Sequence, residues 1–233
     1  MNFNRSSHAR AQVVGAEYDE GLRAYMLRVY NLMAVALGLT GGVAWFTSQS
    51  EALMSAIYGT PLAFVVMLAP LGIVMYLSAR IMRMSASKAQ TWFWIYSGAM
   101  GLSLAYIFLA YTGVSIAKTL FITAGSFAGL SLYGYTTKKD LSSMRGFLVM
   151  GLIGIIIASI VNIFMQSAGL HFAVSVIGVL VFAGLTAYDT QEIKQSYYQG
   201  GGSEHLAILG ALRLYLDFIN LFIFLLQFLG DRR

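Results

Sequence analysis

The stretch that decides the fold is LAILGALRLYLDFINLFIFLLQFLG, residues 206–230. It is long enough for one helix across a bilayer core of about 30 Å, which needs about 20 apolar residues. Two charged residues, Arg213 and Asp217, interrupt it. Asp217 lies near the middle, where an acid costs about 2.5–3.5 kcal/mol on insertion scales and usually faces a bundle interior or water. The stretch therefore predicts a membrane helix with a functional acid at its centre.

The composition of the whole chain agrees with a membrane protein. Of its 233 residues 58% are hydrophobic and only 11% are charged, whereas soluble domains average about 25% charged residues. The chain has no Cys and three widely spaced His, which gives no support to a disulfide framework, a metal centre or a tightly bound cofactor. The net charge of +5 suits the basic cytoplasmic face of a membrane protein and needs no nucleic-acid partner.

Charge-poor apolar stretches precede residues 206–230 along the chain. The stretch 146–188 is too long for one span, and the polar residues 166–171 predict a turn that divides it. We therefore expect an all-α polytopic protein with seven transmembrane helices in residues 29–233, after a cytoplasmic N-terminal segment, residues 1–28. Pro61 and Pro70 are expected to kink the second helix. The remaining stretches are 29–50, 52–79, 89–117 and 119–137.

The basic residues predict the orientation, because cytoplasmic loops carry an excess of Lys and Arg. With the N-terminus inside, the cytoplasmic segments hold Arg5, Arg10, Arg23, Arg28, Arg80, Arg83, Lys88, Lys138, Lys139, Arg145 and Lys194. The other side holds Lys118, Arg232 and Arg233. We therefore expect a cytoplasmic N-terminus and a C-terminus outside.

Two GxxxG motifs, residues 38–42 and 125–129, predict a close approach of helix backbones. Packing within one chain is the simpler interpretation, and a dimer interface is the alternative. We therefore expect a monomer.

A second acid, Asp189, ends the apolar part of residues 146–188 in the run AYDTQ, residues 187–191. Two carboxylates about 4 Å apart inside protein repel by about 4 kcal/mol at an effective dielectric constant near 20. If Asp189 and Asp217 meet, they would share one proton and change charge with pH. Their oxygens also suit Ca²⁺, a hard cation, although two carboxylates alone make a weak site.

Simpler interpretations exist for each of these residues. Arg213 lies four residues before Asp217, so the two could neutralise each other on one helix face. Asp189 could be a solvated acid at a helix end, because counting from residue 171 places it near the cytoplasmic boundary while Asp217 lies near the midplane. Arg80 and Arg83 could be interfacial anchors that extend toward the headgroups.

Four stretches resemble the bacterial branch of the Bax inhibitor-1-like family, also called the transmembrane Bax inhibitor motif family. The resemblance implies six helices around a central seventh, and a pH-sensitive calcium-leak protein of the bacterial inner membrane. Its gate would be the pair Asp189 and Asp217, with Arg83 or Arg80 as an electrostatic latch. The stretches are SIAKTLFITAG (115–125), SLYGYTTKKDL (131–141), AYDTQ (187–191) and LYLDFINLF (214–222).

Two other functions are alternatives to the cation leak. A non-conducting regulator would bind another membrane protein, such as a quality-control protease, which the resemblance allows. An intramembrane aspartyl protease would use two acids to activate water, but residues 214–216, LYL, differ from the Gly-x-Gly of those enzymes. We therefore do not expect an enzyme.

Overall fold

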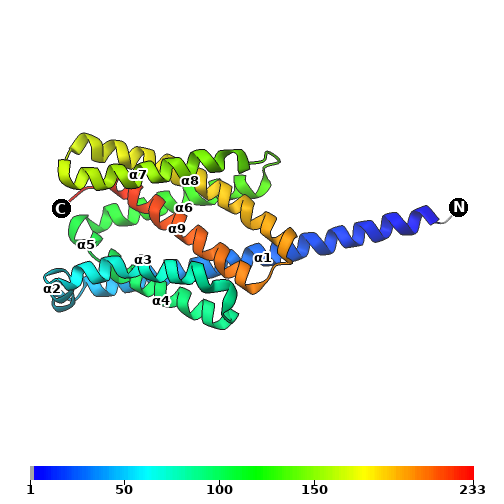
Figure 1. The fold of residues 1–233 in the computed structure, drawn as a ribbon, viewed down its shortest axis with the longest axis horizontal. Coiled ribbons are helices and arrows are strands. Elements are labelled where there is room, and N and C mark those ends of the chain that lie inside the picture. The colour runs from blue at the N-terminus through cyan, green and yellow to red at the C-terminus, as the bar shows by residue number, and fades with distance from the viewer. Residues whose placement is uncertain (1–2) are drawn as a thin grey trace.

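The protein is a bundle of membrane-length helices (Figure 1). The computed structural model describes the chain from residue 3 to residue 233, with side chains from Glu20 onward, so Arg5 and Arg10 of the charge count lie outside the described side chains. Seven helical segments are long and apolar enough to span a membrane, which confirms the predicted number. These segments are Glu20–Ser48, Leu62–Arg83, Ala86–Ala110, Gly113–Thr136, Ser142–Met165, Ala168–Gly200 and Glu204–Leu229.

The helical elements follow in chain order: α1 (Phe3–Ser48), α2 (Glu51–Tyr58), α3 (Leu62–Arg80), η1 (Ile81–Arg83), α4 (Ala86–Leu104), α5 (Ile107–Ala110), α6 (Gly113–Thr136), η2 (Ser142–Met144), α7 (Arg145–Met165), α8 (Ala168–Gly200) and α9 (Glu204–Leu229).

Hydroxyl side chains begin five of these helices. Each accepts a hydrogen bond from the backbone N–H three residues later, which satisfies one of the free donors of the first turn. The chain can reverse between α7 and α8 because Gln166 adopts a left-handed conformation, with φ of 50°, and between α8 and α9 because Gly201 does so, with φ of 64°. The capping residues are Ser50, Ser85, Thr112, Ser167 and Ser203.

Several predicted boundaries move in the structure. The stretch 52–79 divides into α2 and α3 around Pro61, while Pro70 lies inside α3. The Thr112 cap begins α6 early, so Lys118 lies inside that helix and not between two helices. The turn predicted over residues 166–171 is confined to Gln166 and Ser167. Helix α1 also continues without a break across the expected boundary at residue 28.

The close packing expected at the two GxxxG motifs is wrong within this chain. Gly38, Gly42, Gly125 and Gly129 have open space where a Cβ atom would lie. Close approach occurs instead at Gly134, where an added Cβ would lie 2.1 Å from the carbonyl oxygen of Ala187. Spacing alone could not distinguish these positions, because it does not say which face of a helix meets a neighbour.

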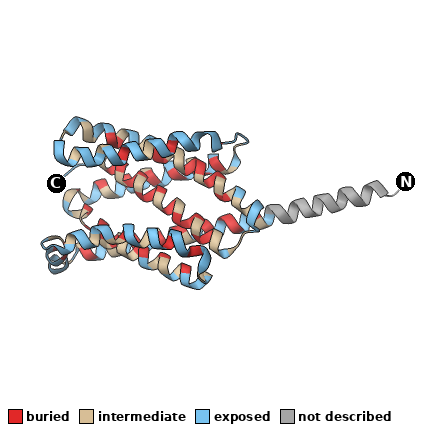
Figure 2. Cartoon of the chain, in the orientation of Figure 1, coloured by how far each residue is buried: buried red, intermediate tan, exposed pale blue. Residues whose placement is uncertain are grey.

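Helix α9 is the central helix of the bundle. In its most apolar window 67% of the residues are buried, against 11% to 39% for the other six spans (Figure 2). It packs against α1, α4, α6 and α8, which supports the expected arrangement around a C-terminal seventh span. A buried hydrogen bond of 2.6 Å between Tyr215 and Thr40 joins it to α1.

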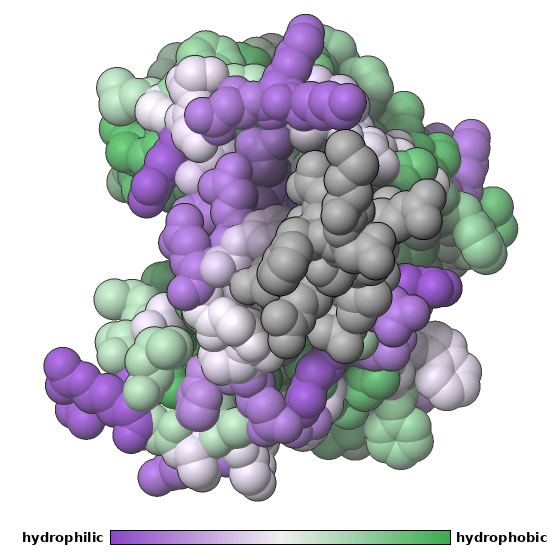
Figure 3. Space-filling view, turned by 90° about the vertical axis from the view of Figure 1, so that its right-hand side faces the viewer, coloured by the Kyte–Doolittle hydropathy of each residue, from purple (hydrophilic) through white to green (hydrophobic). Residues whose placement is uncertain are grey.

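The turns between α3 and α4, α6 and α7, and α8 and α9 lie at one end of the bundle, which we call the basic end (right in Figure 1). Seen from this end, hydrophilic residues gather around the centre and hydrophobic residues cover the flanks (Figure 3). The flanks expose many large apolar side chains, as expected for a surface that faces lipid. The basic residues of this end are Arg80, Arg83, Lys88, Lys138, Lys139, Arg145 and Lys194.

Candidate functional site

Asp217 lies on the central helix among buried apolar residues. Its neighbours along α9 include Leu214, Tyr215 and Phe218, all of them buried, and Asp217 itself is only 4% exposed. One of its carboxyl oxygens, Oδ2, has no hydrogen-bond partner within the described part of the chain. A buried carboxyl group is costly unless it is neutral or well paired, so Asp217 needs a partner that explains its place.

That partner is Asp189 on α8. The two carboxyl groups lie within hydrogen-bonding reach of each other. A carboxylate only accepts hydrogen bonds, so a hydrogen bond between the two groups needs a proton on one of the acids. The structure thus brings together the two acids that the sequence predicted as a pair.

Helix α8 explains how the two acids reach the same depth. It continues to Gly200, so Asp189 lies about 17 Å of helix rise before its end, while Asp217 lies about 20 Å after the start of α9. The two acids lie at the same level of the bundle, so the expected difference in depth between Asp189 and Asp217 is wrong. That expectation placed the end of the helix at Asp189, whereas the polar residues 189–200 continue α8.

Arg213 forms its ion pair with Glu192 and not with Asp217. The distance between Arg213 Nη1 and Glu192 Oε2 is 3.2 Å, and the pair is partly exposed. The charge of Arg213 still acts on both aspartates, and that of Arg145, at the start of α7, acts on Asp189. The two aspartates are therefore not neutralised by a single arginine on the same helix.

Glu192 was not singled out from the sequence, although it belongs to the site. It follows Asp189 by three residues and thus lies on the same side of α8. Besides Arg213 it contacts the hydroxyl group of Tyr188. The i, i+3 spacing of the two acids was the available signal, but a glutamate in a polar run after an apolar segment does not stand out.

Gln191 and Lys194 hold the polar end of α8 against α6 and the link to α7. Gln191 accepts a 2.8 Å hydrogen bond from the backbone N–H of Leu141 and donates one of 2.8 Å to the carbonyl oxygen of Lys139. Lys194 donates to the carbonyl oxygen of Tyr135 at 2.8 Å. These bonds to backbone groups fix the part of α8 that carries Asp189 and Glu192.

Arg80 and Arg83, the predicted latch, are exposed at the basic end. Among the described side chains neither forms an ion pair with Asp189 or Asp217. Arg80 ends α3, which packs mainly against α4 and α2, whereas Arg83 ends η1, which contacts α9 near its start, at the level of His205. In this arrangement Arg213 is the arginine beside the acid pair.

An aromatic pair separates the acids from the opposite end of the bundle. Phe182 on α8 and Phe224 on α9 are buried and stacked, with ring centroids 5.7 Å apart. Each lies seven residues beyond its aspartate, about 10 Å of helix rise. Gly178 makes room for them, since a Cβ there would lie 2.5 Å from the ring of Phe224.

A cavity of about 370 Å³ lies between α7, α8 and α9, lined by Phe224 and by residues on both sides of it along α9, Asn220 and Gln227. Its polar lining comes from Ser159, Asn162, His171, Asn220 and Gln227. The site thus has an acid pair toward the basic end, an aromatic pair at the contact of α8 and α9, and a cavity that extends from Asn220 toward the opposite end.

The acid pair is too small for a resident metal centre. Within the residues that the structure describes, no group of three or more His, Asp or Glu side chains is arranged to hold a metal ion. Ca²⁺ takes six to eight oxygen ligands. A cation at Asp189 and Asp217 would therefore keep water in its coordination shell, which suits passage better than storage.

Comparison with known proteins identifies the family of this chain. The family model described as "Inhibitor of apoptosis-promoting Bax1" matches residues 22–233. An uncharacterized protein of Rickettsia prowazekii is 52% identical over 219 residues, which cover 93% of each chain. The inner membrane protein YbhL of Escherichia coli is 47% identical over 219 residues, 91% of this chain and 94% of its own. The chain therefore belongs to the Bax inhibitor-1 family of integral membrane proteins.

Proposed function

We propose that the protein is a proton-sensitive cation leak of the bacterial inner membrane, with Ca²⁺ as the permeant ion. The observation that carries this proposal is the contact between the buried Asp217 and the partly buried Asp189 inside the bundle. An acid inside a membrane protein is expensive and usually marks an ion or proton pathway. Two such acids in contact form a group whose charge depends on proton occupancy.

The charges of the neighbouring groups make the cluster electrically neutral in one protonation state. Asp189, Asp217 and Glu192 carry up to three negative charges, and Arg213 and Arg145 carry two positive charges. With one proton shared between the aspartates the cluster is neutral. Loss of that proton leaves one excess negative charge and a repulsion of about 4 kcal/mol at about 4 Å. This is enough to bias the packing of α8 against α9 and to attract a cation.

The closed state of this path is the arrangement described above, in which Phe182 and Phe224 seal the centre. Apolar constrictions close channels by excluding water. A movement of α8 against α9 would separate these rings and join the acid pair to the polar cavity. Arg83 or Arg80 could act as a latch only in another arrangement, in which its side chain reaches Asp189 and Asp217.

Calcium flux from proteoliposomes, measured across a range of pH, tests this proposal. The purified protein is expected to release Ca²⁺ at a rate that depends on pH, and Asp217→Asn and Asp189→Asn are expected to remove that dependence. Asp140→Asn is the control, because Asp140 is exposed outside the spans and bonded to Ser142. An unchanged pH profile in Asp217→Asn would contradict the sensor role.

The same measurement distinguishes a regulator without flux. If the purified protein released no Ca²⁺ at any pH, and crosslinking in native membranes captured a stoichiometric membrane-protein partner, a role in controlling that partner would replace the leak.

A further inference from the structure

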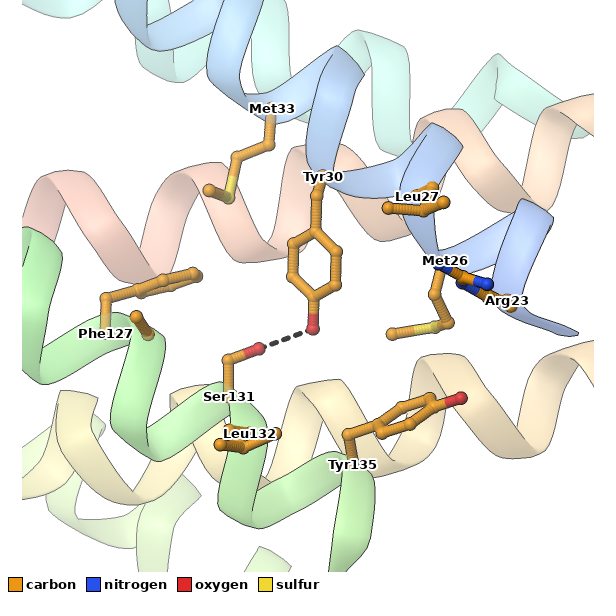
Figure 4. A pocket seen from close by; sticks show the side chains of 10 residues that line it. Arg23, Met26, Leu27, Tyr30, Met33, Phe127, Ser131, Leu132 and Tyr135 are labelled. Atoms are coloured by element: carbon orange, nitrogen blue, oxygen red, sulfur yellow. Dashed lines mark hydrogen bonds between the residues drawn. The ribbon is translucent and has the colours of Figure 1, made fainter.

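A lateral groove lies between α1 and α6 on the flank of the bundle (Figure 4). Both helices pack against α8 and α9 but not closely against each other. The space left between them has a volume of about 510 Å³. Its walls are apolar over most of their area and come from Met26, Leu27, Met33, Phe127, Ala128 and Leu132.

The groove opens toward the lipid and not toward the bundle interior. Leu27 and Leu132, which line its two sides, are 51% and 63% exposed. Along α1 it extends from Arg23 to Met33, about 15 Å of helix rise. This is half of a hydrocarbon core of about 30 Å, so the groove spans one leaflet from headgroup depth to the midplane.

Positive charge lies at the headgroup end of the groove. Arg23 lines this end, and the ion pairs among the described side chains, Arg28 with Glu204 and Arg213 with Glu192, do not involve it. Tyr135 also lines the groove, and the Nζ atom of Lys194 lies 5.1 Å from the centroid of its ring. Basic pockets between membrane helices at headgroup depth select anionic lipids.

The polar groups at the floor of the groove are already bonded. Tyr30 reaches from α1 to Ser131 on α6 at 2.6 Å (Figure 4), and Ser131 is bonded to Thr190 on α8 at 2.9 Å. Thr190 donates in turn to the carbonyl oxygen of Thr186. An acyl chain in the groove would therefore not deprive Tyr30, Ser131 or Thr190 of a hydrogen-bond partner.

We propose that this groove binds one anionic phospholipid of the leaflet at the basic end. One acyl chain lies between the methionines of α1 and the apolar side chains of α6. The phosphate lies at Arg23. The occupant also contacts Tyr30, which is bonded through Ser131 to the residue that follows Asp189, so the lipid lies against the helix that carries the acid pair.

Native mass spectrometry of the delipidated protein, with phosphatidylglycerol or phosphatidylcholine of the same acyl chains added, tests this proposal. The wild type is expected to retain one phosphatidylglycerol with several-fold preference. Arg23→Gln removes the charge and should abolish the preference, and Leu132→Trp fills the groove and should abolish retention of both lipids at this site. The matched controls are Lys88→Gln, a surface cation at the same end, and Leu71→Trp, an exposed position on α3 that faces away from the groove. Both should behave as the wild type.

Three outcomes would overturn the proposal. Equal retention of the two lipids by the wild type would show that the groove does not select charge. Wild-type preference in both Arg23→Gln and Leu132→Trp would place the lipid elsewhere. A mass of two chains in the wild type, lost in Leu132→Trp, would show that a second copy occupies the groove. None of these measurements depends on ion flux, so they can contradict the lipid site without contradicting the proposed leak.

Discussion

At the scale of single residues, Arg213 determines how the charge of the acid pair is balanced. It is bound to Glu192 at 3.2 Å and acts on Asp189 and Asp217 from one turn away. A nearby cation favours the ionised form of a carboxyl group, and a nearby anion opposes it. The balance between Arg213 and Glu192 should therefore set the pH at which the leak responds.

Substitution of Arg213 and substitution of Glu192 should shift the pH of this response in opposite directions. Arg213→Gln removes the cation, so the midpoint of the Ca²⁺ flux profile is expected to rise by about one pH unit. Glu192→Gln removes an anion and frees Arg213, so the midpoint should fall. Arg28→Gln, which breaks the surface ion pair with Glu204, is the control and should leave the profile in place. Shifts of the same sign in the two site variants would contradict this electrostatic account.

At the scale of helices, the contact between α6 and α8 depends on Gly134. A Cβ atom added to Gly134 would lie 2.1 Å from the carbonyl oxygen of Ala187. This oxygen belongs to the backbone, so it cannot move aside as a side chain can. Gly134→Ala should therefore destabilise the protein by about 1–3 kcal/mol, as overpacking does. Gly129→Ala on the same helix meets open space and should be neutral or slightly stabilising. Thermal unfolding in detergent measures both, and equal melting temperatures would show that the two helices can separate.

The contact between α8 and α9 should control leakage through the aromatic pair. Phe224→Ala removes a ring from the seal, so the basal Ca²⁺ flux is expected to rise several-fold while its pH midpoint stays unchanged. Phe228→Ala is the matched control, since Phe228 forms an exposed ring contact with Phe172 on the same two helices. A basal flux in Phe224→Ala no higher than in Phe228→Ala would show that the seal lies elsewhere.

The number of spans and the identity of the two acids could be predicted from the sequence, because apolar length and a charge within an apolar run are local signals. The meeting of the acids could not be derived from spacing, since it depends on the polar residues 189–200 continuing α8. The ion-pair partner of Arg213 could not be predicted from the sequence either. The i, i+4 rule indicated Asp217, whereas the packing of α8 on α9 supplied Glu192.

At the scale of the whole molecule, the uneven distribution of basic residues predicts which end of the bundle faces the cytoplasm. Hydrophilic residues gather at the basic end (Figure 3), and loops rich in Lys and Arg stay in the cytoplasm. The turns and helix ends there carry Arg80, Arg83, Lys88, Lys138, Lys139, Arg145 and Lys194. With this expected orientation, the cavity lined by Phe224 and Gln227 lies toward the outer side of the membrane.

The chain has no cysteine, so single introduced thiols report the orientation without background. In intact spheroplasts a membrane-impermeant maleimide should label Thr60→Cys, in the turn before α3 at the opposite end. It should label Ser87→Cys, at the start of α4 on the basic end, only after permeabilisation. The reverse pattern would place the basic end outside.

The proposal that Asp189 and Asp217 share a proton can be tested directly by infrared spectroscopy. At neutral pH the wild type is expected to show the band of one protonated, non-exchanging carboxyl group inside the bundle, and both Asp217→Asn and Asp189→Asn should remove it. A wild type without this band, or a band that persists in both variants, would contradict the shared proton and with it the proposed gate.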